Sequence, residues 1–172
     1  PAMRYYEQRK WLGTYPAMVA RASTKTGERE TYHVTYLTKD GKKAPVEHQK
    51  KIMTPVRTTN GAGVYLGSVG RRMIVSEGIE TGLAGMQMSN IPAIAAMTAG
   101  GMETLSLPDA VESVVILADN DKNYRGQVAA YTLAARLVNE GRIVQVKVPD
   151  HVGDYLDVLN GSEPVKEAKW TK

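Results

Sequence analysis

The stretch VVILADNDKNYRG, residues 114–126, decides the fold class that we expect for this chain. It opens with an unbroken apolar run, which is typical of a strand that is buried on both faces in a parallel sheet. The run then ends abruptly in two carboxylates, Asp119 and Asp121. The same change occurs upstream in VSEGIETGLA, residues 75–84, where the carboxylate is Glu77. Two separate strands are therefore predicted to finish in acidic side chains.

Strands and helices alternate from residue 71 onward, which predicts an α/β fold with a parallel sheet flanked by helices. The predicted strands lie before Glu77, at 93–97, before Asp119 and at 142–148, the last with the polar alternation of an edge strand. The predicted helices lie at 79–88, 125–141 and 153–159, with a further short helix in the loop 100–108.

The first two long helices each show an apolar stripe at helical spacing, and we expect these stripes to pack on the sheet. They are Ile79, Leu83 and Met86 on one helix, and Val128, Tyr131, Ala135 and Val138 on the other.

Right-handed crossovers restrict the order of the four strands. If the second strand lies on one side of the first and the third on the other, the order is 2-1-3-4. Ligands of open α/β sheets bind outside the carboxyl ends of the strands at such a switch point. Glu77, Asp119 and Asp121 are therefore predicted to meet at one rim of the sheet.

Three carboxylates at one place raise each other's pKa unless a cation lies between them. The chain has no cysteine, and its three histidines are far apart in sequence. The expected cation is therefore one that prefers oxygen ligands, Mg²⁺ or Mn²⁺. A lone D-x-D at a strand end is more often a turn or a helix cap than a metal site. Here, however, the D-x-D and Glu77 each follow the end of a predicted strand in the same βα pattern. This combination favours the metal site.

Residues 1–70 have a different composition, which is polar, basic and rich in Thr and Tyr. Alternating or β-branched runs at 18–23 and 30–38 predict a small mixed, mainly antiparallel β subdomain. The opening RYYEQRKWL, 4–12, is predicted as a short helix, and TTNGAG, 58–63, as a flexible connector.

We expect three parts: a basic subdomain at 1–70, the α/β domain at 71–160 and a flexible tail at 161–172.

Of the 172 residues, 42% are hydrophobic and 23% charged, which is ordinary for a globular protein. No apolar stretch approaches the ~20 residues of a membrane span, and without cysteine there are no disulfides or thiolate zinc sites. We expect a cytoplasmic protein with no membrane partner. The net charge of +4 is weak support for a nucleic-acid partner, but most of the excess lies ahead of Glu77.

VSEGIETGLA followed by VVILADNDKNYRGQVAA resembles the Toprim domain, which bacterial-type primases share with type IA and type II topoisomerases and with some nucleases and recombination proteins. The family signature is a Glu after the first strand and a D-x-D after the third, here Glu77, Asp119 and Asp121. The forms EGIET and DND, and the segment YPAMVARASTKTGERETYHVTYLTKDGKKA, are similar to plasmid- and phage-encoded primases. The resemblance spans roughly residues 15–160 and implies a Toprim-like four-stranded sheet.

The resemblance implies the catalytic core of a DNA primase, a nucleotidyltransferase that joins ribonucleoside triphosphates on a single-stranded DNA template with Mg²⁺ or Mn²⁺. It implies that Asp119 and Asp121 are the main metal ligands, and that Glu77 is either a ligand or a base near the attacking hydroxyl. A replicative helicase, as a domain or a separate protein, is the implied partner. Such primases usually carry a zinc-binding module that this chain lacks, and the chain begins at Pro1, so we expect a core cut from a larger phage or plasmid replication protein.

Other acidic residues receive roles from the same resemblance. Asp154 is the next candidate metal ligand, because related primases have an acidic motif there; equally, it caps the last helix. Asp157 is expected to support the ligands. Glu80 lies one turn from Glu77, and its position alone allows it either to support the ligands, which we expect, or to lie on the surface.

Basic residues are expected to contact phosphate, although each one alone is more often a surface charge. Lys122 and Arg125, beside the D-x-D, are assigned to the triphosphate. Template or nucleotide phosphates are assigned to Lys42, Lys43, Arg57 and Arg72. Tyr32 and Tyr36 either stack on bases or, more often for alternating strands, belong to the core.

Two alternatives stay open. The first is DNA cleavage by a Toprim nuclease or by the metal-binding half of a topoisomerase, although none of the nine tyrosines stands in a recognisable nucleophile context. The second is a non-catalytic Toprim module that binds DNA. A response-regulator receiver is disfavoured, because its acidic pair would follow the first strand, where this chain has Glu77-Gly78.

Overall fold

Parallel and antiparallel strands join in one sheet across residues 1–161, the part of the chain that this computed structural model describes. The strands are β1 (Ala2–Glu7), β2 (Lys10–Ser23), β3 (Arg29–Tyr36), β4 (Lys50–Ile52), β5 (Gly63–Leu66), β6 (Arg72–Ser76), β7 (Ala93–Ala95), β8 (Ser113–Leu117) and β9 (Ile143–Lys147). The helices are α1 (Ile79–Ser89), α2 (Ala99–Thr104), α3 (Arg125–Asn139) and α4 (Tyr155–Leu159). The strand order is β4-β3-β2-β5-β7-β6-β8-β9, with β1 paired to β2.

Strands β7, β6, β8 and β9 are parallel and lie side by side in that order. This confirms the predicted order 2-1-3-4, with β9 at the edge. Strand β8 is buried on both faces, since no residue from Val114 to Ala118 is more than 1% exposed. A fully apolar strand therefore occupies the middle of the parallel region, as the sequence predicts.

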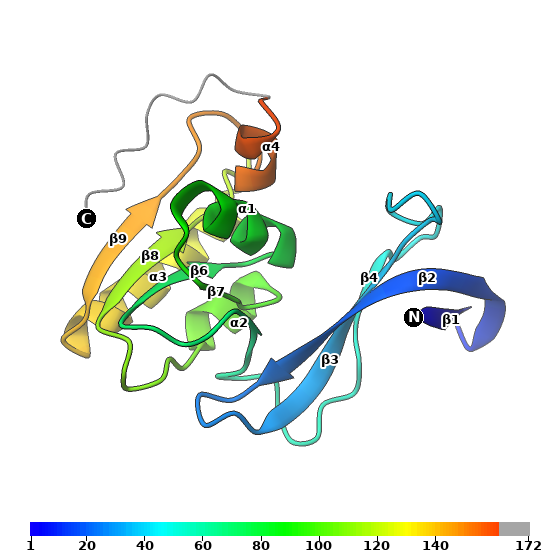
Figure 1. Cartoon of the computed structure of the whole chain (residues 1–172), viewed down its shortest axis with the longest axis horizontal. Helices are drawn as coiled ribbons and strands as arrows, with labels where there is room; N and C mark the ends of the chain where they lie inside the picture. Colours follow the sequence, from blue (N-terminus) through cyan, green and yellow to red (C-terminus); the bar gives the residue numbers. More distant parts are fainter. Residues whose placement is uncertain (162–172) are drawn as a thin grey trace.

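Helices cover both faces of the parallel strands (Figure 1). On one face, Ala84 of α1 and Tyr155 of α4 belong to one buried cluster with side chains of β6 and β8. On the other face, Met102 of α2 and Leu133 of α3 belong to a second cluster. The carboxyl ends of the strands emerge between these two helical layers.

The face of α3 that was predicted to pack on the sheet is exposed instead. Val128, Tyr131 and Val138 are each more than half exposed. The buried stripe consists of Ala129, Ala130, Leu133 and Leu137. Both stripes have helical spacing, but the alanines allow the helix axis to lie closer to the sheet.

Helix α1 packs by small residues as well as by part of its predicted stripe, since Met86 packs against the buried cluster of β6 and β8. Leu83, which was predicted to face the sheet, is 47% exposed, whereas Ile79 is buried as predicted. Gly82 and Gly85 are buried, and a Cβ at Gly85 would lie 2.5 Å from Leu117 Cδ1. The glycines bring α1 into close contact with β6 and β8.

The predicted opening helix at 4–12 is wrong, because β1 and β2 form a hairpin there. Tyr5 is 1% exposed and packs edge-to-face on Tyr15 and Tyr36, at centroid distances of 6.2 and 5.0 Å. Its neighbour Tyr6 is 44% exposed. Burial that alternates from one residue to the next is satisfied by a strand and not by a helix.

Strand β5 joins the antiparallel and parallel regions. Val64 pairs with Ala22 of β2 on one side and with Ala95 of β7 on the other, both antiparallel. The predicted antiparallel region before the α/β domain is confirmed, and it extends the same sheet. In Figure 1 this antiparallel lobe, β1 to β4, projects away from the helices, so that β1 and β9 lie at opposite ends of the molecule.

None of the helices in residues 1–161 is long and apolar enough to cross a membrane. From residue 162 on, the predicted flexible tail lies outside the described residues.

Two neighbouring glycines of α2 have opposite surroundings. A Cβ at Gly101 would lie 2.3 Å from the carbonyl oxygen of Ala96, which is backbone and cannot move aside. A Cβ at Gly100 would meet only Arg125 Nη2, at 3.9 Å. The two positions form a matched pair within one helix.

We expect Gly101→Ala to lower the free energy of unfolding by roughly 2 kcal/mol or more, because an overpacked backbone contact must shift. Gly100→Ala should raise it by about 0.5 kcal/mol, because alanine loses less conformational entropy on folding. Urea denaturation of both variants and the parent measures the difference. Equal effects of the two substitutions would contradict this packing of α2 on the loop after β7.

Candidate active site

Parallel pairing of β6 with β8 brings the predicted carboxylates to one edge of the sheet. Ser76, the last residue of β6, lies opposite Leu117, the last residue of β8. Glu77 and Asp119 therefore follow neighbouring strand ends, and Asp121 lies two residues further on. This edge, formed by residues 77 and 119–121, is called the acidic rim below.

The pKa values indicate that the carboxylates of the acidic rim lie within electrostatic reach of one another. Burial, followed by the charges of Glu77, Asp154 and Asp121, raises the pKa of Asp119 to about 7. Burial, and next the charge of Asp121, raises the pKa of Glu77. Both residues therefore hold a negative charge at a free-energy cost that a nearby cation would relieve.

The start of α3 holds the D-N-D loop in place. The backbone N–H of Gly126 donates to Asp121 Oδ2 at 3.1 Å. Gln127 Nε2 donates to Asn120 Oδ1 at 2.9 Å and to the Asp121 carbonyl at 3.2 Å. A Cβ at Gly126 would lie 2.9 Å from the carbonyl oxygen of Asp119 and 3.0 Å from Asp121 Oδ2. Residue 126 is therefore glycine because the helix lies directly against the acidic loop.

Asp154 lies beside the acidic rim and also caps α4. A backbone bridge between Asn120 and Gly153, with N···O distances of 2.9 and 3.2 Å, ties its loop to the D-N-D. Asp154 Oδ1 accepts from two N–H groups of the first turn of α4, at 2.8 and 3.2 Å. Asp157 completes the capping box by accepting from the Asp154 N–H at 3.2 Å. The cap is thus present, and the roles of Asp154 as a ligand and of Asp157 as its support stay predictions.

Cations of the antiparallel lobe face the acidic rim. Lys50 Nζ of β4 lies 2.8 Å from Glu80 Oε1 of α1. Burial opposes ionisation of Glu80, but the hydrogen bond and charge of Lys50, with the charge of Lys43, lower its pKa overall. The charge of Lys50 also acts on Glu77. Lys43 was predicted to bind phosphate, whereas Lys50 was not.

Of the two cations predicted beside the D-x-D, Arg125 forms an ion pair with Glu103 of α2. Its charge also favours the ionised form of Glu77, so it lies near the acidic rim. Lys122 is exposed in the same loop.

Arg57 lies in a separate ion-pair network. Its Nε donates to Glu30 Oε1 at 2.9 Å, and its Nη2 donates to Glu28 Oε2 at 2.7 Å. Glu30 is 2% exposed, and the hydrogen bonds from Arg57, which outweigh the effect of burial, lower its pKa. In this structure Arg57 neutralises a buried carboxylate and fastens the segment after β4 to β3.

Lys42 pairs with a carboxylate outside the acidic rim, and Arg72 lies at the far end of β6. Lys42 is exposed and pairs with Asp40 at 3.3 Å. Arg72 is the first residue of β6, at the opposite end of that strand from Glu77.

The two tyrosines singled out in β3 differ in their surroundings. Tyr36 is 4% exposed, and its hydroxyl donates to the carbonyl of Arg4 at 3.1 Å, so it belongs to the core. Tyr32 is half-buried beneath the guanidinium of Arg29, which lies 5.5 Å from the ring centroid.

Several residues that contact or lie near the acidic rim had no recognised sequence signal. The hydroxyl of Thr81, which is 1% exposed, donates to Asp119 Oδ1 at 3.5 Å. Gln127 orients the D-N-D loop, and Lys50 comes from a three-residue strand far away in sequence. Thr81 lies one turn after Glu77, on a helix that begins at the acidic rim, and this spacing could have predicted its position near the carboxylates. The position of Lys50 could not be predicted in this way, because it depends on the pairing of β4 with β3.

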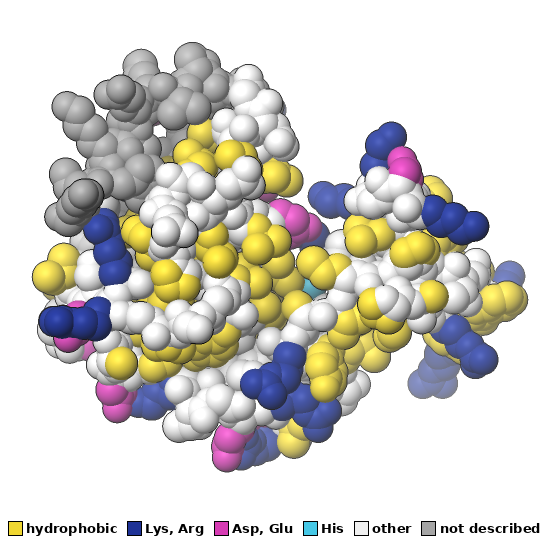
Figure 2. All heavy atoms as spheres, in the orientation of Figure 1, with side chains coloured by type: hydrophobic (Ala, Val, Ile, Leu, Met, Phe, Trp, Pro, Cys, Tyr) yellow, Lys and Arg dark blue, Asp and Glu magenta, His cyan; other side chains and the backbone are white. Residues whose placement is uncertain are grey.

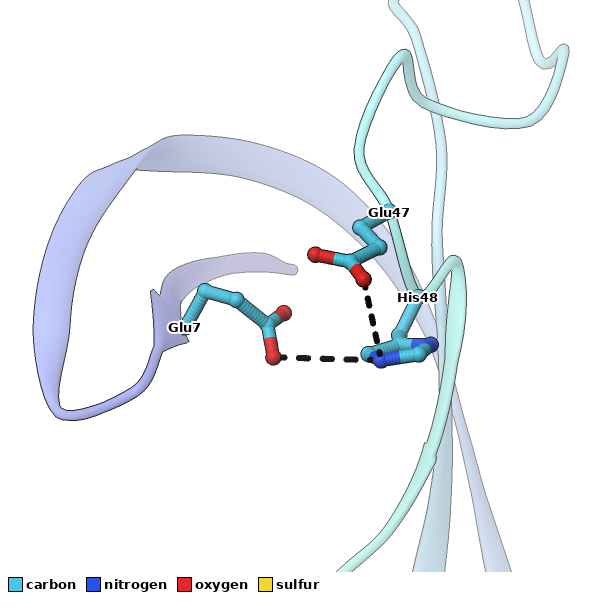
Figure 3. Close-up of side chains that lie close together, drawn as sticks. All are labelled: Glu7, Glu47 and His48. Atoms are coloured by element: carbon cyan, nitrogen blue, oxygen red, sulfur yellow. Dashed lines mark ion pairs between the residues drawn. The ribbon is translucent and has the colours of Figure 1, made fainter.

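A second acidic group lies in the antiparallel lobe (Figure 3). Within residues 1–161, the ligand atoms of Glu7, Glu47 and His48 are the one set of three found within 4.8 Å of one another. Glu7, however, already accepts hydrogen bonds from the Tyr5 hydroxyl and, at 3.3 Å, from Lys51 Nζ. A lysine in this position competes with a metal ion, so we assign no ion to this group.

The donor set of the acidic rim fits a divalent cation that prefers oxygen. Within residues 1–161, the oxygens of Glu77, Asp119 and Asp121 do not all lie within 4.8 Å of one another. All of them are carboxylate oxygens, the ligand type of Mg²⁺ and Mn²⁺. Burial raises the pKa of Asp119, and the charges of Glu77, Asp154 and Asp121 raise it further, so a cation placed there would be stabilised.

A family model described as the Toprim domain matches residues 72–162, which is more than half of the chain. The chain belongs to the Toprim domain family. The expected family is thereby confirmed, and the match runs from β6 to beyond α4. Residues 1–63 match a family described as a domain of unknown function (DUF7146). No curated protein matches the sequence.

Three solved structures with a similar fold are primases or contain primase domains. The Escherichia coli primase catalytic core superposes with a TM-score of 0.57 at 16% identity, over 92% of this chain and 52% of that chain. The RNA polymerase domain of Mycobacterium tuberculosis primase DnaG superposes with a TM-score of 0.50 at 17% identity. The match covers 84% of this chain and 51% of that chain. A third match, with a TM-score of 0.50 at 20% identity, comes from a structure of the bacteriophage T7 lagging-strand DNA polymerase interacting with the primase domains of two gp4 subunits. This match covers 85% of this chain and 72% of that chain. The chain thus spans about half the length of the two bacterial structures, and the shared fold covers the antiparallel lobe as well as the Toprim domain.

We predict that the metal-free protein loses stability as the pH rises from about 4 to 7, because the folded state binds a proton at Asp119 that the unfolded state has already released. Asp119→Asn weakens this dependence, leaving the smaller part due to Glu77, and should melt at a higher temperature than the parent at about pH 8. Thermal melts in EDTA, followed by circular dichroism, measure both.

Added Mg²⁺ should raise the melting temperature of the parent more at about pH 8 than at about pH 5, since ligands must be deprotonated to bind a metal. Asp119→Asn should gain little from Mg²⁺ at either pH. A pH dependence that is the same in parent and variant would contradict the electrostatic description of the acidic rim.

Proposed function

We propose that this chain is the catalytic core of a DNA primase, which synthesises RNA primers on single-stranded DNA in a metal-dependent, template-directed reaction. One observation carries the proposal: an acidic rim of Toprim type faces a basic antiparallel lobe, and the likeness to primase cores extends over both parts. A Toprim domain alone is equally compatible with DNA cleavage. The antiparallel lobe is what favours primer synthesis.

The carboxylates of the acidic rim would hold the ions. A bound divalent ion would lower the pKa of the attacking 3′-hydroxyl and stabilise charge on the phosphoryl and leaving oxygens. We assign Asp119 and Asp121 as the main ligands, with Asp154 as a further one. Glu77, whose pKa is raised by burial and by Asp121, is either a ligand or the base near the hydroxyl.

Cations around the acidic rim would bind and orient the incoming nucleotide. Lys43 and Lys50 face Glu80 across the junction of the two lobes, and Arg125 acts on Glu77 from the opposite side. Together with Lys122, they would contact the triphosphate. The Lys50–Glu80 ion pair would also keep the antiparallel lobe in register with α1.

Lys42, Arg57 and Arg72 stay predicted phosphate contacts. Lys42 and Arg57 pair with other carboxylates, and Arg72 lies at the far end of β6, so we assign them to the template backbone rather than to the reacting phosphates. Arg57 in addition neutralises Glu30. A replicative helicase, as a domain or a separate protein, stays the predicted partner, and the cytoplasm of a bacterial host the predicted compartment.

The test is the synthesis of oligoribonucleotides from the four ribonucleoside triphosphates on single-stranded templates of varied sequence, with Mg²⁺ or Mn²⁺. We expect short, template-dependent products. Asp121→Asn should reduce their formation at least about 10–100-fold, the loss typical even of residues that support metal ligands. Asp109→Asn is the matched control, since Asp109 is an exposed carboxylate paired only with Lys25 in the described structure.

Other outcomes identify the alternatives. Nicking of supercoiled plasmid without RNA synthesis would replace the primase proposal by a Toprim nuclease or topoisomerase function. DNA binding without either reaction, unchanged in Asp119→Asn, would identify a non-catalytic module.

A further inference from the structure

The hairpin of β1 and β2 displays two large aromatic side chains to solvent. Trp11 is 58% exposed and Tyr6 is 44% exposed, and the two residues are directly opposite in the register. They lie at the end of the molecule that is farthest from β9 (Figure 1). Exposed aromatic rings that lie side by side mark a binding surface more often than isolated ones do.

A β-bulge places Trp11 on this face. The register passes from Tyr5–Gly13 to Tyr6–Trp11, so that Leu12 is the extra residue. Without the extra residue, Trp11 would lie on the same face as Gly13 and Tyr5, which is the buried one. The bulge therefore turns the indole away from the core and toward Tyr6.

Three cations surround the aromatic pair. Arg4 is on the same face as Tyr6, while Arg9 and Lys10 form the turn and the start of β2. None of the three has an ion pair within residues 1–161. The acidic residue of the hairpin, Glu7, points to the opposite face, where it binds Tyr5 and Lys51. Figure 2 shows Lys and Arg side chains projecting around the antiparallel lobe.

The turn of the hairpin is strained. Gln8 and Arg9 both have positive φ, 48° and 66°. Two-residue turns of this kind strongly favour Asn-Gly, because side chains such as those of Gln and Arg are disfavoured in the left-handed region. Strain of this kind is concentrated at functional sites. Here it keeps the charge of Arg9 at the tip of the hairpin.

The aromatic face is continuous with the sheet face that looks toward the acidic rim. Arg4 is opposite Thr14, and along β2 the same face continues through Pro16 and Met18. Met18 is opposite Thr35, and Thr35 is opposite Lys50, the residue that pairs with Glu80. One side of the sheet therefore leads from Trp11 to the junction with α1.

We infer that this hairpin is a second single-strand-binding site, remote from the acidic rim, in which Tyr6 and Trp11 stack on bases and Arg4, Arg9 and Lys10 contact phosphates. Stacked aromatic rings within a basic surface bind single strands with little sequence preference, because every base has a π-face. At about 3.3 Å per residue, the seven residues from Trp11 to Met18 span roughly 23 Å along β2. The hairpin would hold the template strand at that distance from Met18. This deepens the proposed function, but its test is binding and not primer synthesis.

The first test uses the length of the oligonucleotide. The parent should bind a single strand of about 20 nucleotides at least tenfold more tightly than Trp11→Ala does, the loss expected for one stacked base. An oligonucleotide of about 4 nucleotides, added with Mg²⁺ and a nucleotide, is too short to reach from the acidic rim to Trp11. It should therefore bind parent and variant with equal affinity. Tyr131→Ala is the matched control, because Tyr131 is an aromatic residue on α3 that is also 58% exposed.

Tryptophan fluorescence gives a direct readout. The chain has two tryptophans, so Trp170→Phe leaves Trp11 as the sole reporter. A long single strand should quench its emission, and a duplex of the same length should quench it much less. Equal affinity of parent and Trp11→Ala for the long strand, with no quenching, would overturn the inference whether or not the protein makes primers.

The second test separates binding from folding. Gln8→Asn with Arg9→Gly gives the turn its preferred residues and removes one charge. The melting temperature should rise by about 2–4 °C, while the salt dependence of log K for the long strand should fall by about 0.7 in slope. A variant that is more stable and binds with an unchanged slope would show that the turn serves the hairpin only.

Discussion

The parallel pairing of β6 with β8 is the constraint on which the rest of this structure depends. It places Glu77 and Asp119 at adjacent strand ends, where burial and neighbouring carboxylates raise the pKa of both residues. The surrounding residues are arranged to keep this unfavourable grouping: Gly126 allows α3 to approach, Gln127 clamps the loop and Asn120 ties it to the segment that carries Asp154. A protein that only needed stability would not gather these charges, so the grouping supports the proposed cation site.

The antiparallel lobe supplies the opposite charge. Its strands continue the Toprim sheet through β5, and Lys50 meets Glu80 across the junction. The Lys50–Glu80 ion pair and the strand pairing through β5 together determine how the basic strands face the acidic rim. The function that we propose needs both parts, because one would hold the ions and the other the nucleic acid.

The fold of the parallel half could be predicted from the sequence, because unbroken apolar strands, crossover handedness and strand-end carboxylates are local signals. The faces of α1 and α3 could not, since two stripes of helical spacing compete and alanines or glycines decide which one lies closer to the sheet. The opening hairpin was missed because RYYEQRKWL contains good helix formers, whereas the burial of Tyr5 against Tyr36 is a tertiary contact. Within the site, the carboxylates were predictable from their motifs. The position of Lys50 beside Glu80 was not, because it depends on the pairing of a short strand with β3.

The most direct measurement of the central claim is anomalous diffraction from crystals grown with Mn²⁺. We predict a peak bounded by carboxylate oxygens of Asp119 and Asp121, with Glu77 or Asp154 completing the site, at ligand distances of about 2.0–2.2 Å. A crystal with Mn²⁺ only at Glu7, Glu47 and His48, or with none at the ends of β6 and β8, would contradict the account.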